Sequence, residues 1–315
     1  MIRCHPWISV AALTLMAVSP LCGQVRIAPQ ADRISVEIDG KPYCDFFLAP
    51  GGNKPYLYPL RTASGIVVTR HYPMEEGETR DHPWHHGMFF EHGAVNGADF
   101  WNTEPTTADP KKGRIVLKKV LEAKGGPKSG TIKAAFDSFG PDGTLFMTDT
   151  RTVTIYSDPQ LRIIDYEIAI ESGRKLTFGD TKEGTFGIRL ATALSEDRTG
   201  KMVNAEGLET EKNVWGKRSA WVDYYGQVDG SAVGVAIMDH PSNPRYPTYW
   251  HSRTYGLFAA NPFGVKDFTG DKSKDGSMTI EPGERVSFRY RVVIHPGDVR
   301  SAGIAALYGK YAAGK

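Results

Sequence analysis

The stretch RDHPWHHGMFFEHGAVNGADFW, from Arg80 to Trp101, concentrates the side chains of this chain that could do chemistry. It contains four of the 9 histidines of the sequence. Histidine can donate and accept a proton near neutral pH, and it is the commonest metal ligand. Acids, an arginine and two tryptophans stand between the histidines, so we expect a functional site here. The candidates are His82 and His86 as catalytic groups, with Arg80, His85, His92, Asn96, Asp99 and Trp101 binding a substrate.

The proline inside the histidine run bears on where the imidazoles point. Pro83 lacks a backbone donor and biases His82 towards an extended conformation. Side chains alternate along an extended segment, so His85 is predicted to point away from His82 and His86. Two or three histidines would then share one pocket, with Arg80 and Asp81 as charge partners. The alternative for any single histidine is a structural bond to a backbone carbonyl.

A metal site is a sharper hypothesis for the same stretch. Its histidines could supply nitrogen ligands, and Glu91 or Asp99 an oxygen. However, the sequence has no HExxH motif and no facial-triad pattern. We therefore expect no particular cofactor, and a divalent metal stays the alternative to acid/base chemistry without metal.

A second group of polar residues lies in KEGTFGIR, residues 182–189. Glu183 stands at the entrance of a predicted strand, where it is either a general base or a solvated turn charge. Ile188 and Leu190 are expected to face the core. Arg189 between them should therefore point to the opposite face, towards a ligand or water.

A third group follows further along, where aromatic residues stand among acids, amides and arginines. Sugars bind to such surfaces because their CH-rich faces pack on aromatic rings, while their hydroxyls need donors and acceptors. Ordinary core packing is the alternative for these aromatic residues. The candidates are Asp223 and His251 as catalytic groups and Tyr224, Trp250, Arg253 and Asn261 as substrate-binding groups.

Alternation of apolar and polar residues predicts the elements that position these groups. In residues 285–294, RVSFRYRVVI, apolar side chains fall on one face and polar ones on the other, as in a strand with one wet face. Only residues 301–313 show helical spacing. The chain is thus predicted to be all-β, a large antiparallel sandwich with a short C-terminal helix, in one domain over residues 24–315. Further strands are expected at 34–38, 65–70, 114–121, 131–139, 145–156, 164–170, 185–190 and 232–238.

Two regions interrupt this strand rhythm and are predicted to be long loops, at residues 71–107 and 204–263. Binding groups often sit on loops that a rigid scaffold holds in place. We therefore predict that these two regions form the walls of one cleft.

The first 23 residues are typical of a secretory signal peptide, with Arg3 before a short apolar run. The chain is therefore expected to be secreted or periplasmic, and a lipid anchor at Cys22 is the alternative to ordinary cleavage. Removal of residues 1–23 would leave Cys44 as the single cysteine. No later stretch approaches the ~20 apolar residues of a membrane span.

The formal net charge of +2 and the absence of a basic cluster disfavour nucleic acid as a partner. No obligate protein partner is evident either. A carbohydrate ligand is the partner that the polar and aromatic groups favour.

Several strings resemble a known family across nearly all of residues 24–315. They are RTASGIVVTRHYPMEEGETRDHPWHHGMFFEHGAVNGADFW, KEGTFGIRLA, WVDYYGQVDGSAVGVAIMDHPSNPRYPTYWHSRTYGLFAANPFG and YRVVIH. They are similar to the secreted bacterial PmoA-like family, often labelled "methane oxygenase PmoA". Methane oxidation is not implied, because the subunit of that name is an integral membrane protein. An oxygenase or hydrolase that depends on a metal is the function that the label suggests.

That family is distantly similar to galactose mutarotase-like supersandwich proteins, which include sugar epimerases and domains of glycoside hydrolases and polysaccharide lyases. The resemblance implies a histidine acid and a carboxylate base, with His86, His251 and Glu183 as candidates by chemistry. We therefore expect an exported carbohydrate-active enzyme of the epimerase, lyase or hydrolase type. A glycan-binding module without catalysis is the competing hypothesis.

Overall fold

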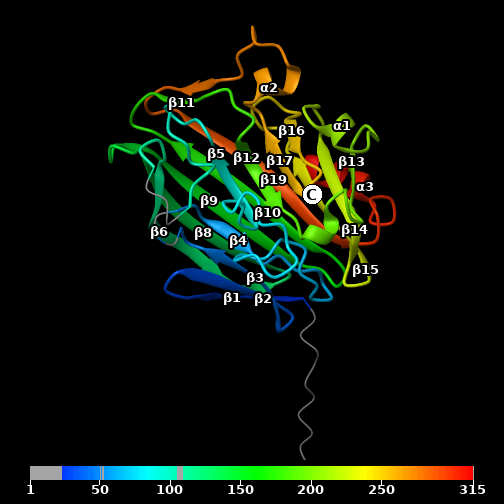
Figure 1. Cartoon of the computed structure of the whole chain (residues 1–315). Helices are drawn as coiled ribbons and strands as arrows, with labels where there is room; N and C mark the ends of the chain where they lie inside the picture. The colour runs from blue at the N-terminus through cyan, green and yellow to red at the C-terminus, as the bar shows by residue number, and fades with distance from the viewer. Residues whose placement is uncertain (1–22, 50, 52, 105–108, 315) are drawn as a thin grey trace, which may run out of the picture.

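The computed structural model describes residues 23–49, 51, 53–104 and 109–314. Two large antiparallel sheets pack face to face in it (Figure 1). The predicted β-sandwich is thereby confirmed. The expected signal peptide lies outside the described residues except for Gly23. Within the described part, no helix is long and apolar enough to cross a membrane.

The nine-stranded sheet runs in the order β16-β17-β12-β5-β4-β3-β2-β1-β7. Its strands are, in that order, Tyr249–Ser252, Leu257–Asn261, Gly184–Arg189, Met88–His92, Tyr56–Tyr58, Lys41–Phe47, Arg33–Ile38, Gln24–Pro29 and Gly126–Pro127. Strands from both halves of the chain thus meet in one sheet, where β12 and β5 are neighbours and β4 is the central strand.

The eight-stranded sheet runs in the order β13-β14-β15-β19-β10-β9-β8-β6. Its strands are Lys201–Asn204, Trp221–Val228, Ser231–Asp239, Arg285–Pro296, Arg162–Glu171, Leu145–Ser157, Ser129–Phe139 and Arg114–Lys124. A small third sheet joins β11 (Leu176–Phe178) to β18 (Met278–Ile280).

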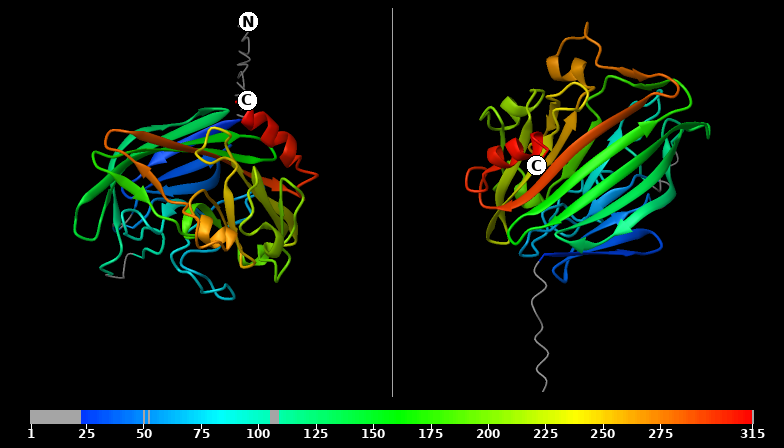
Figure 2. Two further views of the ribbon diagram at one scale, coloured as in Figure 1. Left: turned by 90° about the horizontal axis from the view of Figure 1, so that it is seen from above. Right: turned by 180° about the vertical axis from the view of Figure 1, so that it is seen from behind.

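Helices are few and short. They are η2 (Thr192–Leu194), α1 (Glu211–Val214), α2 (Val265–Thr269) and α3 (Ile304–Ala312). The C-terminal helix α3 confirms the helical spacing, although it begins at residue 304, after the left-handed Gly303 (φ 66°). Figure 2 shows α3 in red, lying against one end of the eight-stranded sheet.

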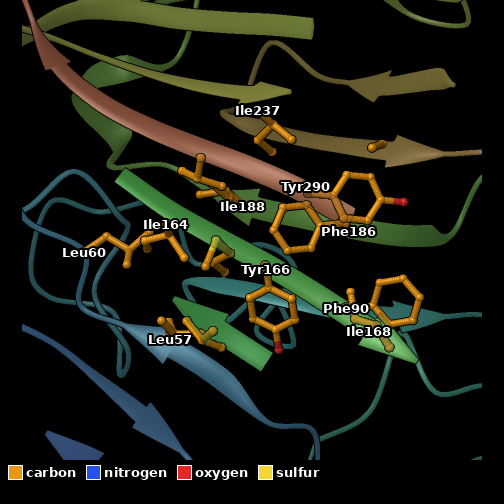
Figure 3. Close-up of a cluster of buried hydrophobic side chains, with 14 of the residues drawn as sticks. Leu57, Leu60, Phe90, Ile164, Tyr166, Ile168, Phe186, Ile188, Ile237 and Tyr290 are labelled. Atoms are coloured by element: carbon orange, nitrogen blue, oxygen red, sulfur yellow. The ribbon is translucent and has the colours of Figure 1, made fainter. Parts of the chain in front are cut away.

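The core lies between the two sheets (Figure 3). Alternate residues of β10, such as Ile164 and Ile168, are fully buried against the nine-stranded sheet. Phe186 of β12 stacks on Tyr290 of β19, with ring centroids 4.5 Å apart. Burial of apolar surface drives this packing, so the alternating pattern in the sequence sets which face of each strand turns inward.

Three expectations about the elements are wrong. Residues 71–107 are not one long loop, because they contain the strand β5. Residues 65–70 form no regular strand and make only single bridges, at Val67 and Thr69. Residues 204–263 are not one long loop, because they contain the four strands β14 to β17. Every residue of β17 is buried. The strand expected at residues 232–238 is β15, whereas β17, covered on both faces, shows no alternation that would indicate it.

Cys44 is a free thiol in the core. Burial raises its pKa, so the thiol is protonated at neutral pH.

Candidate functional site

The candidate site lies on the outer face of the nine-stranded sheet, away from the core. Residues directly opposite each other in neighbouring strands share a face. One row across the sheet reads His251, Ala259, Gly187, Phe89 and Tyr56. The side chains of Tyr56, Phe89 and Ala259 belong to a small apolar cluster separate from the main core. His251 and the neighbours of His86 therefore lie on one side of the molecule.

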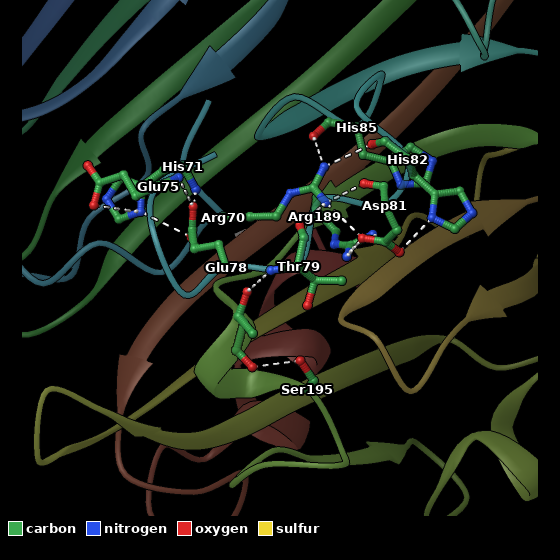
Figure 4. A network of polar contacts seen from close by, with 11 residues as sticks. Arg70, His71, Glu75, Glu78, Thr79, Asp81, His82, His85, Arg189 and Ser195 are labelled. Atoms are coloured by element: carbon green, nitrogen blue, oxygen red, sulfur yellow. Dashed lines mark hydrogen bonds and ion pairs between the residues drawn. The ribbon is translucent and has the colours of Figure 1, made fainter. Parts of the chain in front are cut away.

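Asp81 holds two buried guanidinium groups at this face (Figure 4). Arg189 donates to Oδ1 at 2.6 Å and to Oδ2 at 3.3 Å. Arg70 donates to Oδ1 at 2.9 Å and also to backbone carbonyls of the same loop. Because Ile188 lies in the main core, Arg189 points outward as predicted. The expected ligand partner of Arg189 is, in the structure, a carboxylate of the chain itself.

The same carboxylate fixes His82. Its Nδ1 lies 2.6 Å from Oδ2 of Asp81. Burial raises the pKa of Asp81, but hydrogen bonds and charge from Arg189 and His82 outweigh burial and lower it. Asp81 is therefore ionised at neutral pH, and it fixes the orientation of an imidazole that is about one third exposed.

His82 and His85 do not point apart, which corrects the prediction from Pro83. Their rings stack in parallel, 5.1 Å apart. His82 has a positive φ of 43° instead of an extended backbone. The amide of His85 donates to the carbonyl of His82 at 3.1 Å, closing a turn. The turn brings His82 and His85, three positions apart, onto one side of the chain. An extended segment would place them on opposite sides.

Tyr255 joins the two regions that were predicted to meet. Its ring stacks on His82 at 4.9 Å and lies over the Arg189 guanidinium at 4.6 Å. Arg253 lies at 5.8 Å from the same ring and 3.4 Å from Glu211. Burial raises the pKa of Tyr255 to about 12, although both arginines oppose this. The two regions therefore touch at this ring, and the predicted cleft between them stays a prediction.

His85 lies buried beneath His82, and neither ring nitrogen has a hydrogen-bond partner. Burial and the surrounding cations hold the pKa of His85 well below its usual value, so the ring is neutral. Buried polar atoms are normally satisfied by protein or water. Unpartnered buried atoms gather on this face of the sheet, namely Nε of Arg70 and Arg189, Nε1 of Trp84 and Trp101, and Nδ1 of His86.

His86 forms the second pair of imidazole and carboxylate. Its Nε2 lies 2.9 Å from Oε1 of Glu104, and its ring packs on Tyr72 at 3.7 Å and Tyr56 at 5.0 Å. Burial lowers the pKa of His86, against the opposing effect of Glu104. The imidazole is therefore neutral near pH 7.

Lys54 is a buried cation below the same loops. Its Nζ donates to the carbonyls of Trp84 and Trp101 and lies over the ring of Phe89. Burial lowers the pKa of Lys54 to about 8. Trp101 itself lies against Gly187, where a Cβ would come within 3.3 Å of the indole.

Glu183 and His251 stand at the other end of the row. Lys182 Nζ pairs with Glu183 Oε1 at 2.6 Å, and Nδ1 of His251 lies 2.7 Å from the Lys182 carbonyl. Burial lowers the pKa of His251 to about 4. The two candidates are thus neighbours, on the same face as His82.

Several candidates lie elsewhere and serve the framework. Asp223 is buried in the eight-stranded sheet and pairs with His295 at 3.0 Å, so it does not meet the histidine loop. Tyr224 and Trp250 are core residues. Asn261 bonds the carbonyls of Thr181 and Lys182. These side chains pack or form hydrogen bonds in the interior. Core packing was the alternative considered for the aromatic residues.

The candidates at the end of the first region also have structural partners. His92 lies 2.7 Å from the Gly179 carbonyl, and Asn96 bonds the backbone of residues 175 and 177. Asp99 accepts the amides of Trp101 and Asn102, as turn aspartates do. Arg80 is exposed, with no side-chain bond among the described residues.

In the structure, the side chains that were considered as metal ligands have other partners. Glu91 is buried and paired with Arg151 at 3.0 Å, with its pKa raised to about 7 by burial. Among residues 23–49, 51, 53–104 and 109–314, no group of three or more histidine, cysteine or acidic side chains could hold a metal ion. The histidines of the loop are stacked on rings or bonded to carboxylates, an arrangement that does not fit a ligand set.

Sequence reasoning missed Lys54, Arg70, Tyr72, Glu104 and Tyr255. Arg70 and Tyr72 flank the start of the predicted loop, and Tyr255 lies inside the second region. Only their position next to predicted site segments could have indicated them. Nothing local distinguishes Lys54, which lies 47 residues from its acceptor Trp101.

A family model matches residues 33–309 of the chain. The chain belongs to the "Family of unknown function (DUF6807)". No curated protein matches it.

Solved structures offer distant likenesses. The chain is similar to the GH36 alpha-galactosidase AgaB from Geobacillus stearothermophilus at 9% identity, with a TM-score of 0.43, over 88% of this chain and 42% of the galactosidase. It thus spans less than half of that enzyme. A galactose mutarotase-like protein from Clostridium acetobutylicum gives 9% identity and a TM-score of 0.42, over 87% of this chain and 99% of that one. A galactose mutarotase-like protein from Lactobacillus casei has 10% sequence identity and a TM-score of 0.37, over 86% of this chain and 100% of that one. None of these likenesses says anything about chemistry.

Proposed function

We propose that this protein is an exported carbohydrate-active enzyme in which His82 transfers a proton to or from a sugar. The observation that carries the proposal is the Asp81–His82 pair. A carboxylate on Nδ1 fixes the ring, and no described residue occupies Nε2. An imidazole held in this way can donate or accept a proton near neutral pH.

The surroundings of His82 fit a polyhydroxylated substrate. Tyr255 stacks on its ring and Trp84 meets it edge-on, and both offer partly exposed aromatic surface. Glu104 and Glu183 are partly exposed carboxylates on the same face. Each of the cations Arg70, Arg189 and Arg253 already has a carboxylate partner. These features favour a neutral sugar over a uronic acid.

Glu183 is the carboxylate that we assign as the second proton-transfer group. It flanks His251 at the other end of the row, and its charge acts on Tyr255, as does that of Asp81. A substrate lying over Tyr255 would therefore have one proton-transfer group on each side. The predicted signal sequence at residues 1–23 supports export, and the resemblance to PmoA-like proteins is compatible with it.

Substitution of His82 tests the proposal. Mono- and oligosaccharides are incubated with the protein and followed by proton NMR. Loss of a positioned proton-transfer group costs about 100- to 10,000-fold in rate. His82→Gln should therefore abolish most turnover.

His71→Gln is the matched control. His71 also pairs with a carboxylate, Glu78 at 3.1 Å, and its side chain is 34% exposed against 36% for His82. The control should keep the wild-type rate. Equal rates in wild type and His82→Gln would refute the assigned role.

A glycan-binding module without catalysis is the second candidate. The unpartnered buried nitrogens around His85 favour it, because a bound ligand could satisfy them without any reaction. Calorimetry that detects binding of a sugar, with no product in the NMR assay, would replace the enzyme proposal by this one.

A further inference from the structure

A cavity lies on the opposite side of the sandwich from His82. Its volume is about 690 Å³. It lies between the outer face of β13 and β14 and residues 298–306, which include the start of α3. The main core separates this cavity from the histidine face, so a ligand here would be independent of the proposed reaction.

Aromatic side chains form one wall of the cavity. Trp221 and Tyr225 lie four residues apart on β14 and line it, while Val222 and Tyr224 between them face the main core. Tyr225 is partly exposed. The flat faces of an indole and a phenol are suited to pack on the CH-rich face of a sugar ring.

Asn204 supplies an unused donor in the same wall. Its Oδ1 accepts the amides of Glu206 at 3.2 Å and Leu208 at 2.8 Å, which fixes the side chain. Its Nδ2 is buried and has no partner. The turn uses only the acceptor half of this amide, so the donor half is available to an acceptor in the cavity.

The charged groups of the cavity are of both signs. Glu209, Asp298 and Arg300 line it. Asp298 accepts the amides of residues 300 and 301, whereas neither Glu209 nor Arg300 forms an ion pair within the described part of the chain. The cavity therefore offers anionic acceptors and a cationic donor together, with one negative charge in excess, which disfavours an anionic ligand. Hydroxyl groups can bond to both, because a hydroxyl donates and accepts.

We propose that this cavity binds a short neutral oligosaccharide. The volume lies within the range of about 300–1,000 Å³ that is usual for small-ligand sites. The aromatic wall takes a sugar face, and Asn204, Glu209 and Arg300 take the hydroxyls. The protein thus has a saccharide-binding site apart from the one on the nine-stranded sheet.

Titration of the full chain with the neutral trisaccharides maltotriose, cellotriose and raffinose tests the proposal, by calorimetry and ligand-observed NMR. Tyr225→Ala removes the partly exposed ring. Asn204→Asp keeps Oδ1 for the turn but replaces the free donor with an acceptor. Each substitution should weaken the binding of at least one trisaccharide about tenfold, which is a free-energy change of about 1.4 kcal/mol.

Two controls separate this site from other effects. Phe139→Ala removes a partly exposed aromatic side chain near the other edge of the same sheet and should leave binding unchanged. Tyr225→Ala should keep the wild-type turnover in the proton NMR assay, so failure of the proposed reaction and failure of this site are distinguishable. Absence of binding by all three sugars would overturn the proposal, as would unchanged affinity in both folded test variants.

Discussion

The two outer faces of the sandwich carry their charges in different ways. On the nine-stranded sheet, a loop covers the face, and a single carboxylate, Asp81, serves two guanidinium groups that are almost completely buried. On the eight-stranded sheet, the charges of β10 and β19 stand opposite each other in register, and two of the three pairs are open to solvent, whereas Asp165–Arg291 is partly buried. The pairs are Glu171–Arg285, Glu167–Arg289 and Asp165–Arg291.

This difference distinguishes the candidate site on the nine-stranded sheet from the solvated surface of the eight-stranded sheet. Pairs such as Glu167–Arg289, with both side chains exposed by 40% or more, gain little because water screens them. Buried charges have lost their hydration and depend on their partners. The covered face is therefore where substitutions should matter most and where chemistry can be positioned.

Asp81→Asn should produce the largest loss of stability. The amide leaves Arg70 and Arg189 buried without an anionic partner, so we expect a loss of about 3 kcal/mol in the free energy of unfolding. Urea denaturation measures it. If the free energy of unfolding falls by as little as is expected for an exposed pair, the covered face does not differ from the exposed face in this respect.

Acidification should destabilise the nine-stranded sheet through its buried histidines. Burial lowers the pKa of His92 from 6.5 to about 4, so the unfolded state binds a proton that the folded state does not. Stability therefore falls as the pH drops from 6.5 to 4, by up to about 3 kcal/mol for this group.

His92→Gln tests this pH dependence, because an amide can still donate to the Gly179 carbonyl. The variant should lose less stability than wild type between pH 6.5 and pH 4 in thermal unfolding. An unchanged slope in His92→Gln would contradict the prediction.

His295 of the eight-stranded sheet should show the opposite sign. Burial lowers its pKa, but Asp223 outweighs burial and raises it above 6.5. Its contribution to stability is thus full below pH 6.5 and is lost as the pH rises through the folded-state pKa. His295→Gln should cost about 1–2 kcal/mol more at pH 5 than at pH 9. Equal losses at both pH values would argue against a charged pair.

Glu167→Gln should have the smallest effect. It removes the same kind of charge as Asp81→Asn but from an exposed pair, so we expect a change below about 1 kcal/mol. The urea denaturation used for Asp81→Asn provides the direct comparison. A loss comparable to that of Asp81→Asn would remove the distinction between the two faces.

The sequence by itself determined the sandwich and the faces of its strands. In β10 and β19, water on one side and core on the other impose alternation, and that alternation is visible in the residues. It also placed Arg189 on the outer face, because Ile188 had to turn inward. The clustering of histidines correctly led to the loop that contacts Tyr255.

Only the tertiary structure decided which of these groups meet. His82 adopts a left-handed backbone, and contacts with Asp81 and Tyr255, 173 residues away from it in sequence, hold its ring. Asp223 and His92 carry the same chemical groups as Asp81 and His82, yet their partners are His295 and a backbone carbonyl. Local sequence patterns show which face of a strand is buried, and this is determined for each strand separately. Partner choice depends on contacts between distant segments, and those exist only once the sheets have packed.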